Sequence, residues 1–531
     1  MSAAALTLDQ EAWKPRYNPW LIAVVVALAA FMEVLDTSIA NVALPYMAGN
    51  LGASNDESTW VLTSYLVSNG IILPLSAWFS NVLGRKRFYM VCVVIFTISS
   101  FLCGVAPSLS ALIFFRVVQG LGGGGLQPSA QAILADSFPV SKRGMAFAIY
   151  GLAVVFAPAI GPTLGGWITD NFEWRWIFLI NIPVGAVALL ATGRLIEDPP
   201  HILEAKKTAS LKVDYIGIGL LALGFGCLQV VLDKGQQEDW FDSRFVIWFT
   251  VIAVVSLLTA LFWELHHSAP VVDLSLFRDS NFAVATGMMF MLGFVLLGST
   301  LMLPLFTQTL LGYDATTAGM AISPGGVVIM FFMPVVGFML QKFQPRLLIV
   351  LGLFITGVSI LHMTQFTLGV DFRTVVMARI YQSIGMAFMF VPISTVAYAY
   401  IPPGKNNAAS ALINLARNIG GSFGIAFVAT LLARRAQYHQ SVLVSHLYGG
   451  NPQLLGALHG TAQVFGRMQA NSQDALRQAY GLLMGQVERQ ATMLAFIDTF
   501  EVLGWTFLVM LPFVFLLRRV KSGKGGSMAA H

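Results

Sequence analysis

Two acidic residues, Glu33 and Asp36, lie near the middle of the first long apolar stretch of the sequence. They are three positions apart, which places them on one face of a helix. A carboxylate in hydrocarbon is costly unless it is paired, hydrated or protonated. An acidic pair at this depth therefore indicates a path for an ion or a proton.

The composition places these residues in a membrane protein. Hydrophobic residues make up 56% of the 531 residues and charged residues 11%, with a mean hydropathy of +0.73, whereas about 25% of the residues of a soluble domain are charged. Because a helix needs about 20 apolar residues to cross a bilayer, we predict an all-α integral membrane protein with fourteen spanning helices. The expected spans are residues 20–45, 57–80, 88–106, 109–135, 144–168, 176–196, 213–232, 244–264, 282–305, 315–340, 346–369, 373–400, 408–432 and 494–517.

Lysine and arginine gather on one side of this topology. An even number of spans puts both ends of the chain on that side, which also carries the runs Arg85-Lys86-Arg87 and Lys142-Arg143. The positive-inside rule makes it the cytoplasmic side, and it nearly exempts long loops, where most of the opposite-side charges fall. The net charge of +5 thus belongs to the cytoplasmic face and gives no support for nucleic-acid binding.

Arg116 of the fourth span is a candidate partner for Asp36. At 1.5 Å per residue from the outer helix ends, the two lie roughly 10 and 13 Å deep, so they can meet. We hypothesise that Asp36 pairs with Arg116 when ionised and releases it when protonated. A permanent ion pair that pins two helices together is the alternative.

The sequence around Arg116 recurs 263 residues later. Arginine, glutamine, glycine, proline and lysine return in register: Arg116, Gln119, Gly122, Pro139 and Lys142 match Arg379, Gln382, Gly385, Pro402 and Lys405. A parallel repeat of six spans builds one large transporter architecture, with the substrate path between the halves. We predict an N-terminal six-helix bundle in residues 1–200, two additional spanning helices in 201–280, and a C-terminal six-helix bundle in 281–531 that includes a long periplasmic loop at 433–490.

Several motifs together resemble the major facilitator superfamily, in particular its fourteen-span drug:proton antiporters of the EmrB and QacA type. They are Leu35-Asp36-Thr37-Ser38 to Pro45, Gly84-Arg85-Lys86-Arg87, Arg116 to Gly125, Gly161-Pro162-Thr163-Leu164-Gly165-Gly166, Trp174-Arg175-Trp176 to Gly185, and Leu232-Asp233-Lys234-Gly235-Gln236. The resemblance implies the major facilitator fold, with two pseudo-symmetric bundles plus two extra helices. One motif departs from the pattern, since Asn81 stands where the superfamily usually has Asp, so a charge-based latch through that position does not carry over.

The fifth span concentrates residues that weaken a helix. Proline removes a backbone hydrogen bond and glycine removes side-chain bulk, so a kink and very close helix packing both become possible. In the resembled superfamily this stretch marks exporters that exchange, while a plain packing interface is the other interpretation. The residues are Pro158, Gly161, Pro162, Gly165 and Gly166.

Further polar residues at membrane depth are candidates to line a cavity. A satisfied interhelical hydrogen bond is about as common a role for any one of them. They are Gln119, Gln127, His362, Gln365, Arg379, Gln382, Asn414 and Arg417.

Enzyme chemistry finds little support. The run Gly122 to Gly125 lacks the following Lys-Ser/Thr pair and lies inside an apolar span, so we expect no phosphate loop. Cys92, Cys103 and Cys227 lack metal-ligand or redox spacing, and we predict no metal site. With no cofactor expected, energy must come from an ion gradient.

We therefore expect a proton-coupled multidrug efflux transporter of the bacterial inner membrane. Its substrates would be amphipathic or hydrophobic compounds, often aromatic or cationic, exported by alternating access through a proton-coupling group of Asp36, Glu33 and Arg116. A dedicated exporter of one endogenous metabolite, such as a siderophore or fatty acid, is the alternative. Since the EmrB-like group works with a periplasmic adaptor and an outer-membrane channel, the 433–490 loop is the expected docking surface.

Overall fold

The structure is a computed structural model that describes residues 15–200, 202–203, 214–267, 270–448, 451–466 and 472–518, and within these ranges it is helical without strands. The N-terminal half contains α1 (Pro19–Leu51), α2 (Asn55–Ser58), α3 (Trp60–Leu83), α4 (Arg85–Gly104), α5 (Leu109–Gly123), α6 (Leu126–Ser137), α7 (Val140–Asn171), α8 (Trp176–Leu179) and α9 (Asn181–Leu195). A helical pair follows, α11 (Tyr215–Lys234) and α12 (Arg244–His266), with the short η2 (Trp240–Asp242) between them.

The C-terminal half begins after the short η3 (Leu274–Arg278). It contains α13 (Ser280–Thr309), α14 (Ala315–Met339), α15 (Pro345–His362), η4 (Met363–Gln365), α16 (Phe372–Ala397), η5 (Pro403–Lys405), α17 (Asn406–Ser445), α18 (Pro452–Gly466), α19 (Ser472–Val509) and η6 (Leu511–Leu516). Fourteen helical segments in the described chain are long and apolar enough to cross a membrane, which confirms the predicted number.

Side chains at the helix ends explain where several spans begin. Asn18 accepts a hydrogen bond from the backbone N–H of Trp20 at the start of α1, and aspartates cap α11, α13, α14 and α16 in the same way. Such caps satisfy backbone donors that the helix itself leaves free. Gly52 ends α1 in the left-handed conformation, at φ 65°, which costs glycine little.

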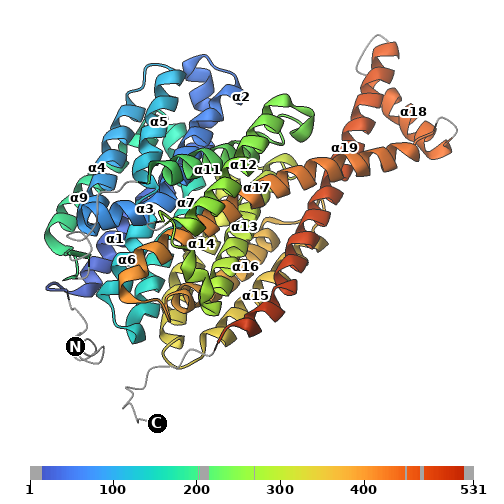
Figure 1. Cartoon of the computed structure of the whole chain (residues 1–531). Helices are drawn as coiled ribbons and strands as arrows, with labels where there is room; N and C mark the ends of the chain where they lie inside the picture. The colour runs from blue at the N-terminus through green and yellow to red at the C-terminus, as the bar shows by residue number, and fades with distance from the viewer. Residues whose placement is uncertain are drawn as a thin grey trace, which may run out of the picture.

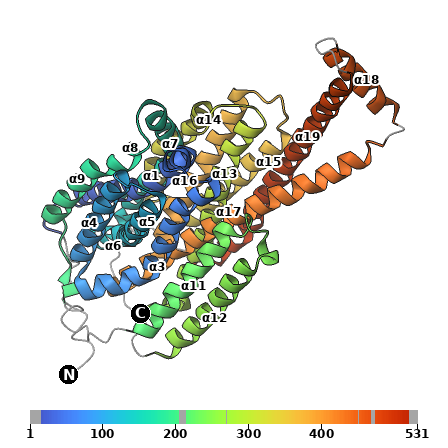
Figure 2. The ribbon, with the colours of Figure 1, turned by 90° about the horizontal axis from the view of Figure 1, so that it is seen from above.

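The two halves lie side by side and meet along two seams, one formed by α7 and the other by α17. Helix α7 packs on α14, and α3 packs on α17 (Figures 1 and 2). The α11–α12 pair lies outside this bundle, where α11 contacts both α3 and α17 (Figure 2). The two extra helices therefore cover one of the seams between the halves.

The predicted long loop is largely helical. Helix α17 continues without interruption to Ser445, and α18 and the first turns of α19 complete an arm that projects from the bundle (Figure 1). Apolar residues three and four apart at 474–484 favour such a helix over an irregular loop. The segment predicted between the last two spans, at 433–490, is thus built largely of helices.

Candidate functional site

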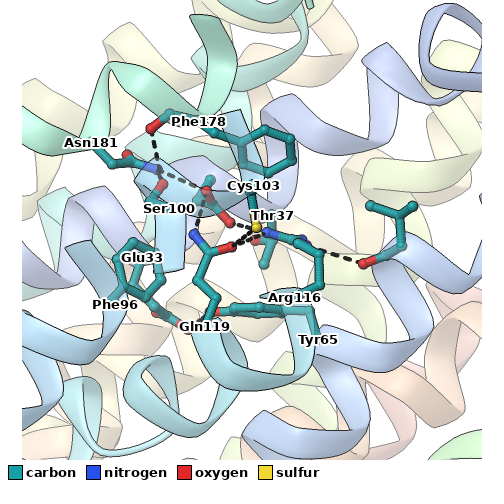
Figure 3. A network of polar contacts seen from close by, with 12 residues as sticks. Glu33, Thr37, Tyr65, Phe96, Ser100, Cys103, Arg116, Gln119, Phe178 and Asn181 are labelled. Carbon is teal, nitrogen blue, oxygen red and sulfur yellow. Dashed lines mark hydrogen bonds and ion pairs between the residues drawn. The ribbon is translucent and has the colours of Figure 1, made fainter. Parts of the chain in front are cut away.

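Asp36 lies in a closed cluster of hydrogen-bond donors. Its Oδ2 is 2.5 Å from Nη1 of Arg116, and both side chains are fully buried. Its Oδ1 accepts hydrogen bonds from Gln119 at 2.9 Å and from Asn181 at 2.7 Å (Figure 3). Each carboxylate oxygen therefore has at least one donor, which is the condition under which a buried ion pair is tolerated.

Arg116 is held from several helices. Its Nε donates to the carbonyl oxygen of Val61 at 3.0 Å, and its Nη1 also donates to Gln119 at 2.9 Å. The rings of Tyr65 and Phe178 flank its guanidinium, with centroids at 4.4 and 5.4 Å, so cation–π attraction adds to the pair. The cluster joins α1, α3, α5 and α9.

Glu33, one helical turn away, lies in a different environment. Its Oε1 accepts hydrogen bonds from the Tyr65 hydroxyl at 3.1 Å and from Asn69 at 3.2 Å, while its Oε2 accepts one from Gln127. Among the described residues, no cation lies within ion-pair distance of Glu33, and its nearest donors are neutral. The two carboxylates of α1 therefore differ in their partners: Asp36 is paired with an arginine, and Glu33 accepts hydrogen bonds from neutral donors.

A cavity of 120 Å³ lies between the halves and contains Glu33. Helices α1, α3 and α5 to α7 line it from one side, and α13 and α17 from the other. The lining residues are Glu33, Val34, Thr37, Tyr65, Leu66, Asn69, Leu73, Gly123, Gly124, Gln127, Val154, Pro158, Gly293, Leu296, Leu297, Asn414, Arg417 and Asn418. Most of them are apolar or neutral, and Glu33 and Arg417 are the acidic and basic residues of this lining.

Three predicted residues therefore share the cavity with Glu33, namely Gln127, Asn414 and Arg417. Gln119 and Gln382 are instead buried beside Arg116 and Arg379, respectively, where they accept hydrogen bonds. Arg379 is also buried outside this cavity.

His362 and Gln365 are candidates from the sequence to line a cavity, and neither lines the cavity that contains Glu33. Both are exposed, at the end of α15 and in η4. The 18 residues of α15 span about 27 Å at 1.5 Å per residue, which nearly uses up the hydrocarbon thickness. Their positions at the end of the span explain why both lie away from Glu33.

The glycines of α7 allow close contact with α1. A Cβ added at Gly161 would be 2.2 Å from Oγ of Ser38, and one at Gly165 would be 3.2 Å from Ile39. Ser38 donates to the carbonyl oxygen of Pro158 at 3.3 Å, an oxygen near the point where Pro162 removes a helical donor. Helix α7 nevertheless continues through both prolines, and a Cβ added at Gly166 would meet no atom closer than 4.0 Å.

The end of the bundle where α1 begins and η6 ends, here called the terminal end, is closed by contacts between the halves. Arg85 pairs with Asp136 and donates to Asn407 of α17 at 2.7 Å, while Asn407 donates to Asn81 at 3.0 Å. Asn81 thus takes part through an uncharged hydrogen bond, as its departure from the family pattern predicts. The acidic partner in this closure is Asp136, which pairs with Arg85 and which the sequence analysis did not single out.

Other functional residues were also missed. Tyr65, Asn69 and Tyr150 surround Glu33 and Gln127, and Asn181 binds Asp36. Asn181 stands between two isoleucines at membrane depth, and a polar residue in that position is a signal that could have identified it.

Comparisons with known proteins agree with this architecture. Residues 26–425 match the Major Facilitator Superfamily. The chain is 34% identical over 512 residues to the multidrug export protein EmrB of Escherichia coli strain K12, covering 96% of this chain and 98% of that protein. It is 36% identical over 507 residues to the fatty acid resistance protein FarB of Neisseria gonorrhoeae, covering 94% and 96%.

Solved structures show the same fold at low sequence identity. The proton:xylose symporter XylE matches with a TM-score of 0.60 at 13% identity, covering 95% of this chain and 97% of that one. The human organic anion transporter MFSD10 matches with a TM-score of 0.59 at 14% identity, covering 95% and 100%. The predicted fold and resemblance are confirmed, and the chain belongs to the major facilitator superfamily, as an EmrB-like, multi-pass membrane transporter.

Proposed function

We propose that the protein exports amphipathic and hydrophobic compounds in exchange for protons, by alternating access between its two halves. The observation that carries the proposal is a buried carboxylate, Glu33, in a cavity that both halves line. An ionisable group at such a seam can bind a proton in one state and release it in the other. An intramembrane acid without a function would be a cost to the fold.

Within this proposal Glu33 carries the proton and Asp36 organises the N-terminal half. Glu33 lines the cavity and its direct hydrogen-bond donors are neutral, so its protonation breaks no ion pair. Protonation of Asp36 would leave Arg116 without its counter-charge in a fully buried site, which is expensive. The division of roles therefore follows from the partner of each carboxylate.

The cavity supports substrates of mixed chemistry. Apolar side chains such as Val34, Leu66 and Leu296 form part of its walls, beside the polar groups around Glu33. Apolar walls without fixed hydrogen-bond demands discriminate weakly between ligands. The names of multidrug relatives point the same way.

Transport by purified protein in liposomes tests the proposal. A pH gradient should drive movement of a fluorescent lipophilic cation by wild type, and Glu33→Gln should abolish this coupling. Asp36→Asn serves as the comparison, since its loss of transport should accompany loss of stability. Transport that ignores the gradient in wild type would rule out proton exchange.

A second candidate is the dedicated export of one endogenous metabolite, such as a siderophore or fatty acid. The similarity to a fatty acid resistance protein favours this alternative. A competition panel separates the two functions. Mutual inhibition among chemically unrelated compounds supports multidrug export, whereas one tight ligand without cross-inhibition supports the dedicated role.

The proposed location is the bacterial inner membrane, with both chain ends in the cytoplasm. The terminal end would then face the cytoplasm and the helical arm the periplasm. The arm exposes apolar side chains, among them Tyr448, Val464 and Tyr480, and would dock a periplasmic adaptor that connects to an outer-membrane channel. Deletion of residues 440–485 should abolish capture of that adaptor, and retained capture would refute the role.

A further inference from the structure

Two side-chain amides connect Glu33 of the N-terminal half to neighbouring residues of α17. Gln127 donates its Nε2 hydrogen to Oε2 of Glu33, and its Oε1 accepts a hydrogen bond from Nη2 of Arg417. Asn69 donates to Oε1 of Glu33 at 3.2 Å, and its Oδ1 accepts from Asn418 at 3.3 Å. Both amides therefore have the same orientation, with nitrogen toward the carboxylate and oxygen toward α17.

The chemistry of the end groups imposes this orientation. An ionised carboxylate only accepts hydrogen bonds, so the amide must turn its NH₂ group toward Glu33. The amide oxygen then points at α17, where a donor is required. Arginine only donates, and Arg417 meets that requirement; Asn418 can present either of its own amide atoms.

Protonation of Glu33 changes which amide atom Gln127 must turn toward the carboxyl group. A protonated carboxyl group has an O–H donor, which favours an amide turned with its oxygen toward Glu33. The NH₂ group of Gln127 would then face the Arg417 guanidinium, donor against donor. The Gln127–Arg417 contact is consequently compatible with the ionised state and opposed by the protonated one.

Arg417 belongs to the seam that closes the terminal end. Asn407, Ser410, Asn414 and Arg417 follow one another at helical spacing along one face of α17, and each contacts the N-terminal half. Ser410 donates to the carbonyl oxygen of Pro128, and Asn414 donates to Gln131 at 2.9 Å. Arg417 is the last residue of this row, so a change at Arg417 affects one end of a continuous interface between α17 and the N-terminal half.

We propose that Gln127 and Arg417 are positioning residues that make closure of the terminal end depend on the charge of Glu33. Ionised Glu33 holds the amide in the orientation that binds Arg417 and keeps this end closed. A proton arriving from the opposite side breaks the contact and allows this end to open. The inference rests on the proposed proton exchange and gives it a physical link between proton and gate.

The other groups around Glu33 do not supply such a link. Tyr65 of α3 contacts Glu33, and Tyr150 of α7 donates to Oε1 of Gln127 at 3.2 Å, but both belong to the N-terminal half. A hydroxyl group can donate or accept, so each adapts to either state. Asp36 and Arg116, one turn away, are paired with each other. Arg417 is thus the charged group that reaches this site from the C-terminal half.

Spin labels across the terminal end test the proposal. Cysteines introduced at the exposed positions Ser141 and Gly404 place one label on each half, while the natural Cys92, Cys103 and Cys227 are buried. The distance distribution is measured in lipid nanodiscs as the pH is lowered. In wild type the ratio of closed to open molecules should fall by about tenfold, the effect of one hydrogen bond to a charged group. In Glu33→Gln the ratio should stay constant.

Two replacements of Arg417 test whether the pH response needs a side chain that only donates hydrogen bonds, or any side chain that contacts Gln127. Arg417→Lys keeps a group that only donates and should retain the pH response. Arg417→Gln can donate or accept, so it should bind Gln127 in either orientation and lose the response. The matched control is Ser410→Ala, which removes a contact of the same seam to a backbone carbonyl oxygen, outside the lining of the cavity around Glu33, and should lower closure equally at every pH.

Two outcomes would overturn the inference. One is a full pH response in Arg417→Gln, and the other is a response lost alike in the lysine and glutamine variants. If transport in liposomes remains proton-driven in these cases, the proposed function stands and this link alone fails. A wild type that neither responds to pH nor couples transport to the gradient would remove both.

Discussion

Arg116 and Arg379 occupy matching positions in the two halves of the internal repeat, but their partners differ. Arg116 is paired with Asp36. Arg379 is 97% buried and donates to Gln382 at 2.8 Å, while its Nε has no hydrogen-bond partner among the described residues. Helices α13 to α17 contain no Asp or Glu, so the C-terminal half offers Arg379 no acidic side chain from these spans.

This difference shows which half contains the acidic residues of the membrane-spanning core. Carboxylates at the centre of the bundle come from α1, whereas the C-terminal half contributes donors and amides to the seam. The first half can therefore change charge, and the second can respond through Arg417. The two halves have the same arrangement of helices. They differ in the part of the transport cycle to which each contributes.

The largest expected effect comes from breaking the N-terminal pair. Asp36→Asn leaves Arg116 buried without a counter-charge, so the free energy of unfolding should fall by about 3–5 kcal/mol. Thermal unfolding of the purified protein in detergent measures this change. The double variant Asp36→Asn with Arg116→Gln should regain most of the loss, and a double variant as unstable as the single one would contradict the charge argument.

Replacement of the matching arginine in the C-terminal half should change the free energy of unfolding in the opposite direction. Arg379→Met removes a buried charge that has no acidic partner, and it should raise the free energy of unfolding by about 1–3 kcal/mol, within the range for buried ionic groups replaced by apolar ones. Arg116→Met should lower it, because Asp36 then remains unpaired. Equal destabilisation by both substitutions, measured in the same unfolding assay, would mean that the two arginines are equivalent.

The sequence predicts the arrangement of the spans but only some of the side-chain contacts between them. The fourteen spans and the repeat follow from apolar length and from residues in register, and the Asp36–Arg116 meeting follows from their depths. The partners of Glu33 do not follow, because Tyr65, Gln127 and Arg417 come from three helices whose rotations depend on packing. His362 shows the converse, since a polar residue near the end of a span resembles one at its centre in sequence.

The halves should behave alike where helices touch through glycine. Gly161 and Gly424 are 263 residues apart, and a Cβ added to them would lie 2.2 Å from Ser38 and 2.0 Å from the carbonyl oxygen of Phe294. Alanine at either position should cost about 1–3 kcal/mol through overpacking. Gly166→Ala is the control, because its nearest neighbour, Thr316, is 4.0 Å away, and it should unfold at the temperature of wild type or above.

The smallest effect concerns a surface difference between the repeats. Lys142 is exposed, whereas its counterpart Lys405 is 2.7 Å from Asp273. Burial raises the pKa of Asp273, but the hydrogen bond and charge of Lys405, with hydrogen bonds from Ser275, outweigh it and hold the pKa below its ordinary value. A lowered pKa stabilises the folded state above the ordinary value of about 4 and loses that contribution as the pH falls through the folded value.

Asp273→Asn should therefore reduce stability at pH 7 by at most about 1 kcal/mol, as expected for a partly exposed ion pair. The difference from wild type should vanish below the folded pKa of Asp273, in the acid range under about pH 4. Unfolding temperatures of both proteins, measured from pH 7 to the acid limit, test this convergence. Added salt should shrink the difference at pH 7 as well, because it screens exposed charges. A gap that persists in acid and in salt would assign the effect to packing of the α12–α13 connection, and the two repeats would then differ there in shape instead of charge.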